Sequence, residues 1–247
     1  MAAAVPRDQL APHNLRIAMY ASLVVAAITV VTFGLALLAV PISGANCSGE
    51  CLGYPYLDTL DRFPRDYLWM YAAMGLMVAY LVFVVSLRAV FLPPGAVLAD
   101  VAAALAAVST AVLVPTYFVQ TLVVPASLAA GETEGITLLT QYNPHGVFIA
   151  LEEVGYLLMS VSFLAMVPLL KREGRTIRVI RWLFAGAFVV PALALIAYSV
   201  AFGLDRMDRF EVVVISVNWL VLIVSSVLIA RLLRGRLGTD PSAGRSA

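Results

Sequence analysis

Histidine and cysteine are scarce in this sequence, with two of each among its 247 residues. The two histidines, His13 and His145, are too few for the membrane hydrolases that hold zinc with three histidine ligands. No metal ion or other cofactor is therefore predicted. A metal site made of His145, Glu152 and Glu153 is not excluded by residue type, but its geometric support is weak.

Charged residues are also few. They make up 13% of the chain, against 62% hydrophobic residues and a mean hydropathy of +0.95, whereas soluble domains carry roughly 25% charged residues. A soluble core of this length could not bury so much apolar surface, so lipid must surround most of the chain. The basic residues lie in short segments between apolar runs, which predicts no nucleic-acid partner. All of them except Lys171 are arginine, a bias that suits a GC-rich bacterial genome.

The sequence instead contains long apolar runs. About 20 residues are needed to cross a hydrocarbon core roughly 30 Å thick. Unpaired backbone groups are too costly in lipid, and the runs are too long and uniform for barrel strands. We therefore expect an all-α polytopic transmembrane bundle within residues 1–236, followed by a disordered cytoplasmic tail at 237–247. The six expected spans are about 17–42, 67–92, 97–125, 147–170, 182–204 and 210–233.

The positions of Lys and Arg predict the orientation, because basic residues accumulate in cytoplasmic loops. With the N-terminus inside, the inner flanks hold twelve basic residues and the outer flanks hold four. Both termini are therefore expected in the cytoplasm, with the protein in the plasma membrane. The first apolar run exceeds the roughly 7–15 residues of a signal-peptide core, which favours a retained helix, although Ser43-Gly44-Ala45 loosely resembles a cleavage site. The four outer basic residues are Arg62, Arg65, Arg206 and Arg209.

Two outer loops stand out by their length, 43–66 and 126–146. The first contains both cysteines, Cys47 and Cys51. An outer location favours oxidation, and Gly49 between them allows a tight turn. Three residues separate the cysteines, so the pair is not the redox motif with two intervening residues. We expect a structural disulfide, with free thiols or metal binding as the alternatives.

The most informative stretch is 143–159, at the start of the fourth expected helix. Asn143 before Pro144 is typical of a helix cap with proline at the first helical position. Glu152 and Glu153 would then lie roughly 10 Å further along the axis, inside the outer leaflet. An ionisable side chain at that depth costs about 2.5–3.5 kcal/mol and usually faces the bundle interior. By helical spacing, one stripe is shared by His145, Glu152, Tyr156 and Met159.

Polar side chains on other helices are expected at similar depth. Tyr117 and Gln120 share a face in the outer half of the third helix, Tyr198 lies in the outer half of the fifth, and Asn218 lies near the middle of the sixth. Together they predict a polar pocket that opens outward beneath the two long outer loops. The predicted ligand-binding residues are Glu152, Glu153, His145, Tyr156, Tyr117, Gln120, Tyr198 and Asn218.

A purely structural interpretation stays open for each of these residues. The two glutamates could be held neutral and bonded to polar groups of neighbouring helices, as contacts that fasten the bundle. His145 could be an interface or capping residue, and the tyrosines could be packing aromatics with a satisfied hydroxyl. Asp100 and Glu211 lie near helix starts, where the helix dipole and headgroup water explain them without a function.

Two classes of membrane enzyme can be tested against these residues. Prenyl-protein proteases carry arginine four residues after a Glu-Glu pair and histidines further on, but here Leu157 stands at that position and no histidine follows His145. Sterol isomerases of the emopamil-binding type pair buried glutamate with His, Asn and Trp. The set Glu152, Glu153, His145, Asn218 and Trp219 is similar to that inventory, but its order and spacing differ. Neither mechanism is expected.

The stretch 141–159 resembles a motif of uncharacterised bacterial six-helix integral membrane proteins, of the domain-of-unknown-function type. The resemblance covers about twenty residues, and the rest of the chain agrees only in its hydropathy. It implies no activity.

These residues support three hypotheses about function. The leading hypothesis is binding or transport of a small amphipathic or cationic ligand, with Glu152 and Glu153 holding its charge or exchanging a proton. Its basis is two buried carboxylates with no Lys or Arg at their depth. The alternatives are a membrane enzyme that acts on a lipid or isoprenoid by paired-carboxylate acid/base chemistry, and a structural or accessory membrane subunit. The expected partners are the lipid bilayer and a small ligand, and an oligomer is left open.

Overall fold

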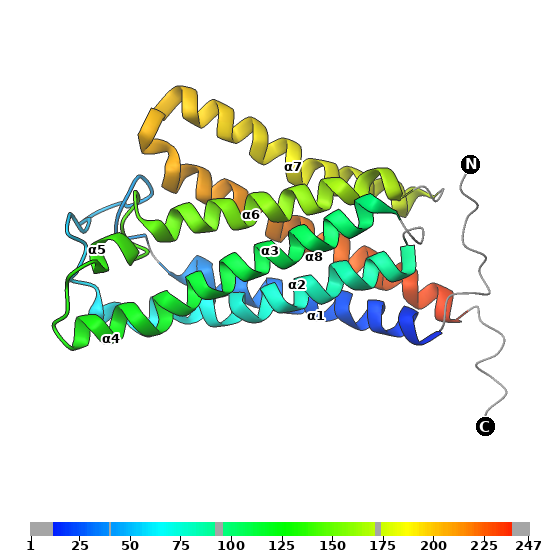
Figure 1. Ribbon diagram of the computed structural model, residues 1–247, viewed down its shortest axis with the longest axis horizontal. Coiled ribbons are helices and arrows are strands. Elements are labelled where there is room, and N and C mark those ends of the chain that lie inside the picture. Colours follow the sequence, from blue (N-terminus) through cyan, green and yellow to red (C-terminus); the bar gives the residue numbers. More distant parts are fainter. Residues whose placement is uncertain (1–11, 40, 92–95, 171–173, 239–247) are drawn as a thin grey trace.

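The computed structural model describes residues 12–39, 41–91, 96–170 and 174–238, and every regular element among them is helical. Long helices run side by side along one axis (Figure 1). Five stretches are long and apolar enough to cross a membrane, and the last of them folds back on itself at η6 (Gly203–Arg206), so that six long helices result. The expected all-α bundle of membrane-spanning helices is confirmed. The five stretches are Pro12–Leu38, Arg65–Phe91, Val97–Ala129, Val147–Leu169 and Arg175–Gly238.

Large apolar side chains cover the outside of the bundle. Val200 and Leu204 are 84% and 89% exposed, and many other Leu, Val and Ile side chains along all six long helices are exposed with them. Water would penalise such a surface, at about 25 cal/mol for each Å² of apolar area. A lipid environment removes this cost, in agreement with the composition.

Five helices form a closed ring, and the sixth packs on its outside. α1 (Pro12–Leu38) lies between α2 (Leu68–Phe91) and α8 (Met207–Gly238), while α3 (Val97–Phe118) lies between α2 and α6 (Val147–Met166). The ring closes because α6 contacts α8.

The sixth long helix, α7 (Arg175–Phe202), packs mainly against α6, α8 and the short turns at its own ends. Its buried residues all fall between Ile177 and Pro191, and none follows. Accordingly, α7 leans away from its neighbours as it approaches η6 (Figure 1). The part of α7 after Pro191 therefore has little apolar packing against the ring.

α3 and α6 approach each other closely at Gly155. A Cβ at this position would lie 2.4 Å from Cγ of Leu113, so only glycine fits. Two serine hydroxyls donate hydrogen bonds across the same interface, from Ser109 to the Gly155 carbonyl and from Ser162 to the Ala102 carbonyl, both at 2.8 Å. Small residues and interhelical hydrogen bonds of this kind are how helices associate in lipid. They hold Tyr117 of α3 and Glu152 of α6 face to face.

The outer half of the third span is not a regular α-helix. After Phe118 the chain makes a π-helical turn, η4 (Val119–Val123), and then continues as α4 (Val124–Ala129). Pro115 precedes this turn and Pro125 follows it, and proline disturbs helical hydrogen bonding because it has no backbone N–H. The π turn places Gln120 and Thr121 inside the bundle. Such turns are frequent at functional sites.

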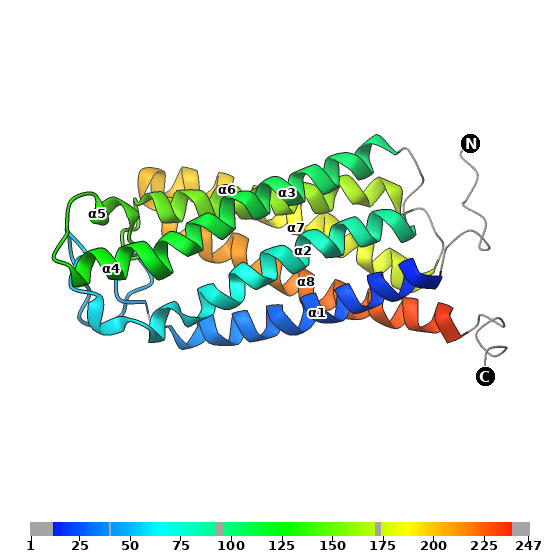
Figure 2. The same ribbon diagram turned by 60° about the horizontal axis from the view of Figure 1, so that its bottom comes forward.

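The outer loops form one end of the molecule, with the short helices η2 (Leu60–Arg62), η3 (Arg65–Tyr67) and α5 (Ile136–Leu139). α1 begins and α8 ends at the opposite end (Figures 1 and 2), as an even number of spans requires. The sidedness of these two ends stays a prediction.

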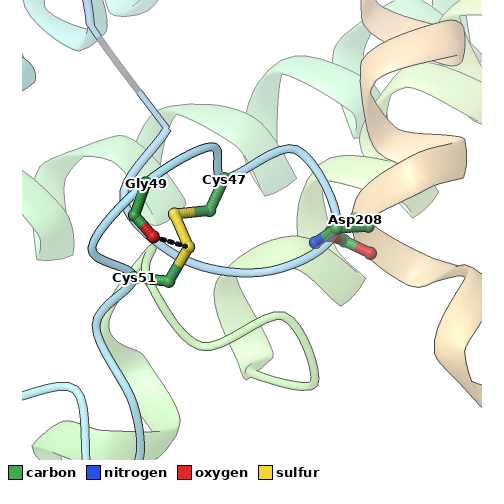
Figure 3. Close-up of a disulfide and its surroundings, with 5 residues drawn as sticks. Cys47, Gly49, Cys51 and Asp208 are labelled. Carbon is green, nitrogen blue, oxygen red and sulfur yellow. Dashed lines mark hydrogen bonds between the residues drawn. A yellow bond between two sulfur atoms is a disulfide. The ribbon is translucent and has the colours of Figure 1, made fainter.

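The expected disulfide is confirmed. Cys47 and Cys51 are joined at an S–S distance of 2.01 Å (Figure 3). The loop is attached to the start of α8, because the Ala45 N–H donates to Oδ2 of Asp208 at 2.5 Å. The preceding residue, Gly44, has φ +68°, and a Cβ there would collide with the same carboxylate. The outer loop is therefore fastened to the α7–α8 turn.

Several boundaries differ from those expected; the first span, for example, covers Pro12–Leu38 rather than 17–42. α7 begins at Arg175 rather than near 182, because its first two turns are amphipathic, with exposed arginines and buried Ile177 and Ile180. α8 runs to Gly238, two residues beyond the expected start of the tail. The rest of that expected tail, 239–247, lies outside the described residues, as do the first eleven residues.

Candidate functional site

α6 carries the two acidic residues at its outer end. The helix begins at Val147 after Gly146, three residues later than the expected proline start. Asn143 does not cap the helix. Its side chain organises the preceding turn, accepting from the His145 N–H at 3.0 Å and donating to the Thr137 carbonyl at 2.8 Å. Glu152 thus lies about 8 Å along the helix axis.

Both glutamates are buried, at 0% exposure for Glu152 and 6% for Glu153. They point neither into bulk solvent nor toward lipid. A buried carboxyl needs partners, because an isolated charge in a low-dielectric interior is very costly. The two side chains find different partners.

Glu152 is bound by a chain of aromatic donors. The Tyr117 hydroxyl donates to Oε1 of Glu152 at 2.7 Å, and the hydroxyls of Tyr117 and Tyr156 lie 3.0 Å apart. The indole N–H of Trp219 donates to the Tyr156 hydroxyl at 3.0 Å. All four side chains are buried. The structure thus brings together three of the residues that sequence reasoning singled out, from α3 and α6, and adds Trp219 from α8.

Glu211 of α8 is the residue that sequence reasoning missed. Its carboxyl group lies against that of Glu152. A hydrogen bond between two carboxyl groups requires a proton on one of them. Glu211 was assigned to headgroup water because it lies near a helix start, but its spacing of seven residues from Asn218 places both on one face of the helix. That shared face was the available signal.

Glu153 is paired with Arg206. The guanidinium Nη1 lies 3.2 Å from Oε1 and 3.0 Å from Oε2, and the Arg206 side chain is only 25% exposed. The expectation that no Lys or Arg lies at the depth of the glutamates is therefore wrong. Arg206 belongs to the turn between α7 and α8, and its long side chain reaches back along the bundle to place its charge beside α6.

A second polar contact joins the same turn to the segment just before α6. His145 Nε2 lies 3.4 Å from Oδ1 of Asp205, with side-chain exposures of 56% and 80%. His145 is therefore a surface residue. It does not join Glu152 in a buried cluster, because α6 begins only after it and helical spacing does not extend that far.

Gln120 lies apart from the glutamates. Its amide donates to the Leu139 carbonyl, and its carbonyl oxygen accepts from the Gln141 N–H at 2.9 Å. Gln120 thereby fastens the segment after α5 to the π turn of the third span. It also lines a mainly apolar cavity of about 290 Å³ between α3 and the start of α6, together with Phe148 and Leu151.

Asn218 and Tyr198 have different surroundings. The Asn218 amide nitrogen lies 2.9 Å from Oγ of Ser160 and 2.8 Å from the Val214 carbonyl, which fastens α8 to α6. Its Oδ1 is buried and accepts no hydrogen bond from the described residues. Tyr198 packs edge to face on Phe202 and forms no hydrogen bond within the described part of the chain.

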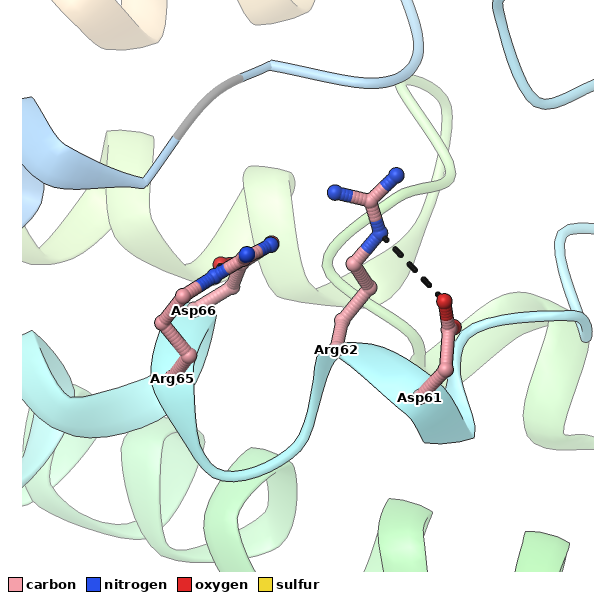
Figure 4. Close-up of polar contacts among 4 residues, drawn as sticks. All are labelled: Asp61, Arg62, Arg65 and Asp66. Carbon is pink, nitrogen blue, oxygen red and sulfur yellow. Dashed lines mark hydrogen bonds and ion pairs between the residues drawn. The ribbon is translucent and has the colours of Figure 1, made fainter.

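The outer loops make their own polar contacts. Arg65 Nε lies 2.7 Å from the buried carboxylate of Asp66, and the more exposed pair Arg62 and Asp61 is 3.9 Å apart (Figure 4). Burial raises the pKa of the nearby Tyr142 phenol, so this group is neutral at ordinary pH. A second cavity, of about 530 Å³, lies at this end and is lined by Leu57, Asp58, Leu60, Asp61, Leu128 and Thr133.

No cluster of three or more His, Cys, Asp or Glu side chains suited to a metal ion occurs among the described residues. What the site offers is acid/base chemistry. Three carboxyls, the guanidinium of Arg206 and the phenols of Tyr117 and Tyr156 lie close together here, and the carboxyls can exchange a proton. Such a site can hold a proton, or a cation in its place.

Comparison with protein-family models, curated proteins and solved structures finds no match. The resemblance of 141–159 to six-helix bacterial membrane proteins therefore stays a prediction, and the function must be argued from the site.

Proposed function

We propose that this chain is a multi-pass membrane protein that binds or transports a small amphipathic or cationic ligand at the acidic cluster of Glu152, Glu153 and Glu211, with a proton exchanged in the process. The observation that supports it is the contact between the carboxyl groups of Glu152 and Glu211 inside a bundle of helices long and apolar enough to cross a membrane.

The energetic cost of the cluster favours a function over simple fastening. Each ionisable side chain within the membrane costs about 2.5–3.5 kcal/mol, whereas an interhelical hydrogen bond contributes on average only about 0.6 kcal/mol. Ser109 and Ser162 already supply such bonds between α3 and α6 without a charge. Three acidic side chains would fasten the helices at a much higher energetic cost.

The orientation belongs to this proposal. The end at which α1 begins and α8 ends would face the cytoplasm of a bacterial cell, because it carries most of the arginines. The acidic cluster would then lie in the outer half of the plasma membrane, within reach of a ligand from the outside or from the outer leaflet.

The test is ligand-dependent thermal stabilisation of the purified protein. Tetraphenylphosphonium, a compact amphipathic cation, should raise the unfolding temperature of the native protein and of Glu132→Gln, which removes an exposed outer acid. It should have little effect on Glu152→Gln/Glu153→Gln. Equal shifts in all three proteins would remove the proposal.

A membrane enzyme acting on a lipid or isoprenoid is the second candidate. The pair of Glu152 and Glu211 favours it, because two carboxyls that share one proton can act as acid and base. Lipid extracts from cells with and without the gene decide between the two: a changed lipid species supports the enzyme, and unchanged lipids support binding or transport.

A structural or accessory subunit is the third candidate. It is supported by the contacts of Glu152 with Tyr117 and of Glu153 with Arg206, which connect separate helices. In that case the double Gln variant should fold less well, and no cation should bind to the native protein.

A further inference from the structure

We propose that the proton of the acidic cluster resides on Glu211, which donates it to an ionised Glu152, and that this proton leaves when a cation binds. The location of the proton stands on the contacts of the free protein. Its exchange for a cation rests on the proposed function.

Trp219 permits a direction of the hydrogen bonds that ends on Glu152. An indole N–H can only donate, so the Tyr156 hydroxyl accepts from Trp219 and its own proton is free to donate onward to Tyr117. Tyr117 in turn donates to Oε1 of Glu152. In this arrangement every donor of the series is directed toward Glu152, as an ionised carboxylate requires.

The second oxygen of Glu152 completes the argument. Oε2 is buried, and no amide, hydroxyl or basic group among the described residues donates to it. The Glu211 carboxyl group is the one that lies against Glu152. A protonated Glu211 supplies the missing donor. The reverse assignment, with the proton on Glu152, would move the charge to Glu211, beside Glu153 and Asp208.

The surroundings of Glu211 agree with this assignment. Glu152 and Glu153 face it from α6, and Asp208 lies one turn earlier on α8. The guanidinium of Arg206 is bonded to Glu153. Negative charge thus surrounds Glu211, which disfavours its ionisation.

Glu211 is also the solvent-accessible end of this series of hydrogen-bonded side chains. It is half-buried, whereas Glu152, Tyr117 and Tyr156 have no exposed surface. When its O–H bond breaks, the proton leaves and a carboxylate is left beside ionised Glu152. An incoming organic cation restores the charge of the site, so one proton leaves for each cation that binds.

Infrared spectroscopy of the full-length protein tests the location of the proton. The C=O stretch of protonated carboxyl groups should report one such group at pH 7 in the native protein and in Glu132→Gln. Glu211→Gln should lose this band, because the Gln amide can donate to Glu152 without a proton from solvent. A native protein without the band, or Glu211→Gln with it, would overturn the assignment.

A second variant keeps the test decisive if Glu211→Gln does not fold. Tyr117→Phe removes the donor to Oε1 of Glu152 and should shift the frequency of the carboxyl band, while Tyr20→Phe on the exposed face of α1 should not. An unshifted band in Tyr117→Phe would show that the protonated carboxyl does not contact Glu152, and would overturn the assignment.

Proton release on binding tests the exchange. In weak buffer with a pH-indicating dye, tetraphenylphosphonium should release one proton for each cation bound to the native protein and none from Glu211→Gln. Binding without release overturns the exchange. Absence of binding, together with the expected infrared result, removes the proposed function and leaves the proton on Glu211.

Discussion

Tyr117 of α3 and Glu152 of α6 meet at the centre of the outer half of the bundle, with the phenol oxygen 2.7 Å from Oε1 of the carboxyl group. The pair depends on the close approach of α3 and α6 at Gly155, one turn away. The buried acidic group therefore lies next to a helix interface built from small residues. Packing, hydrogen bonding and charge each contribute to this pair, and single substitutions can measure them separately.

Replacing Tyr117 by phenylalanine should lower the free energy of unfolding by about 1.5–3 kcal/mol, the contribution of a hydrogen bond to a charged group. The ring is kept, so the loss measures the hydroxyl. Unfolding in detergent provides the measurement, with Tyr20→Phe as the control, since Tyr20 is exposed. Equal stability of the two variants would contradict a hydrogen bond to an ionised Glu152.

Replacing Gly155 by alanine should destabilise the protein by about 1–3 kcal/mol, because the added Cβ overlaps Leu113 and overpacking forces the helices apart. Gly75→Ala in α2 is the matched control. No atom lies within 4 Å of a Cβ placed there, so that change should be neutral or stabilise by up to about 1 kcal/mol. The same unfolding assay distinguishes them, and a harmless Gly155→Ala would disprove the close approach.

Replacing Arg206 by glutamine should cost about 2 kcal/mol. Breaking a fully buried ion pair costs roughly 3–5 kcal/mol, and the quarter exposure of Arg206 reduces this. A double-mutant cycle with Glu153→Gln should recover part of the loss, because the second change removes the unpaired charge.

Arg62→Gln serves as the control for that cycle. Its partner Asp61 is exposed and 3.9 Å away, and surface pairs contribute at most about 1 kcal/mol. If Arg206→Gln and Arg62→Gln lose equal amounts, the contact with Glu153 is not a buried ion pair.

Removing the disulfide with Cys47→Ser/Cys51→Ser should lower stability by about 2 kcal/mol, since closing so short a loop restricts the unfolded chain only modestly. The same pair reports sidedness. In intact cells, a membrane-impermeant reductant followed by an impermeant maleimide should label the native protein and leave the serine variant unlabelled. Labelling only after the membrane is permeabilised would place the loop in the cytoplasm and reverse the proposed orientation.

The number of helices, their apolar exteriors and the disulfide followed from the sequence by itself. Lipid allows only structures that satisfy backbone groups internally, so long apolar runs determine helices without any knowledge of their neighbours. Cys47 and Cys51 are close in sequence, and a short loop leaves them few other partners. The burial of Glu152 and Glu153 was predictable for the same reason, because lipid rejects charged side chains wherever they lie on a spanning helix.

The partners of the two glutamates were decided only by the tertiary structure. Tyr117, Arg206 and Glu211 are between 35 and 59 residues away in sequence from the glutamates they contact. Hydropathy places a side chain at a depth, but it does not give the rotation of one helix against another or the reach of a long side chain from a turn. Those depend on interhelical packing, such as the contact at Gly155, and they decide whether neighbouring acids meet a cation, a phenol or each other.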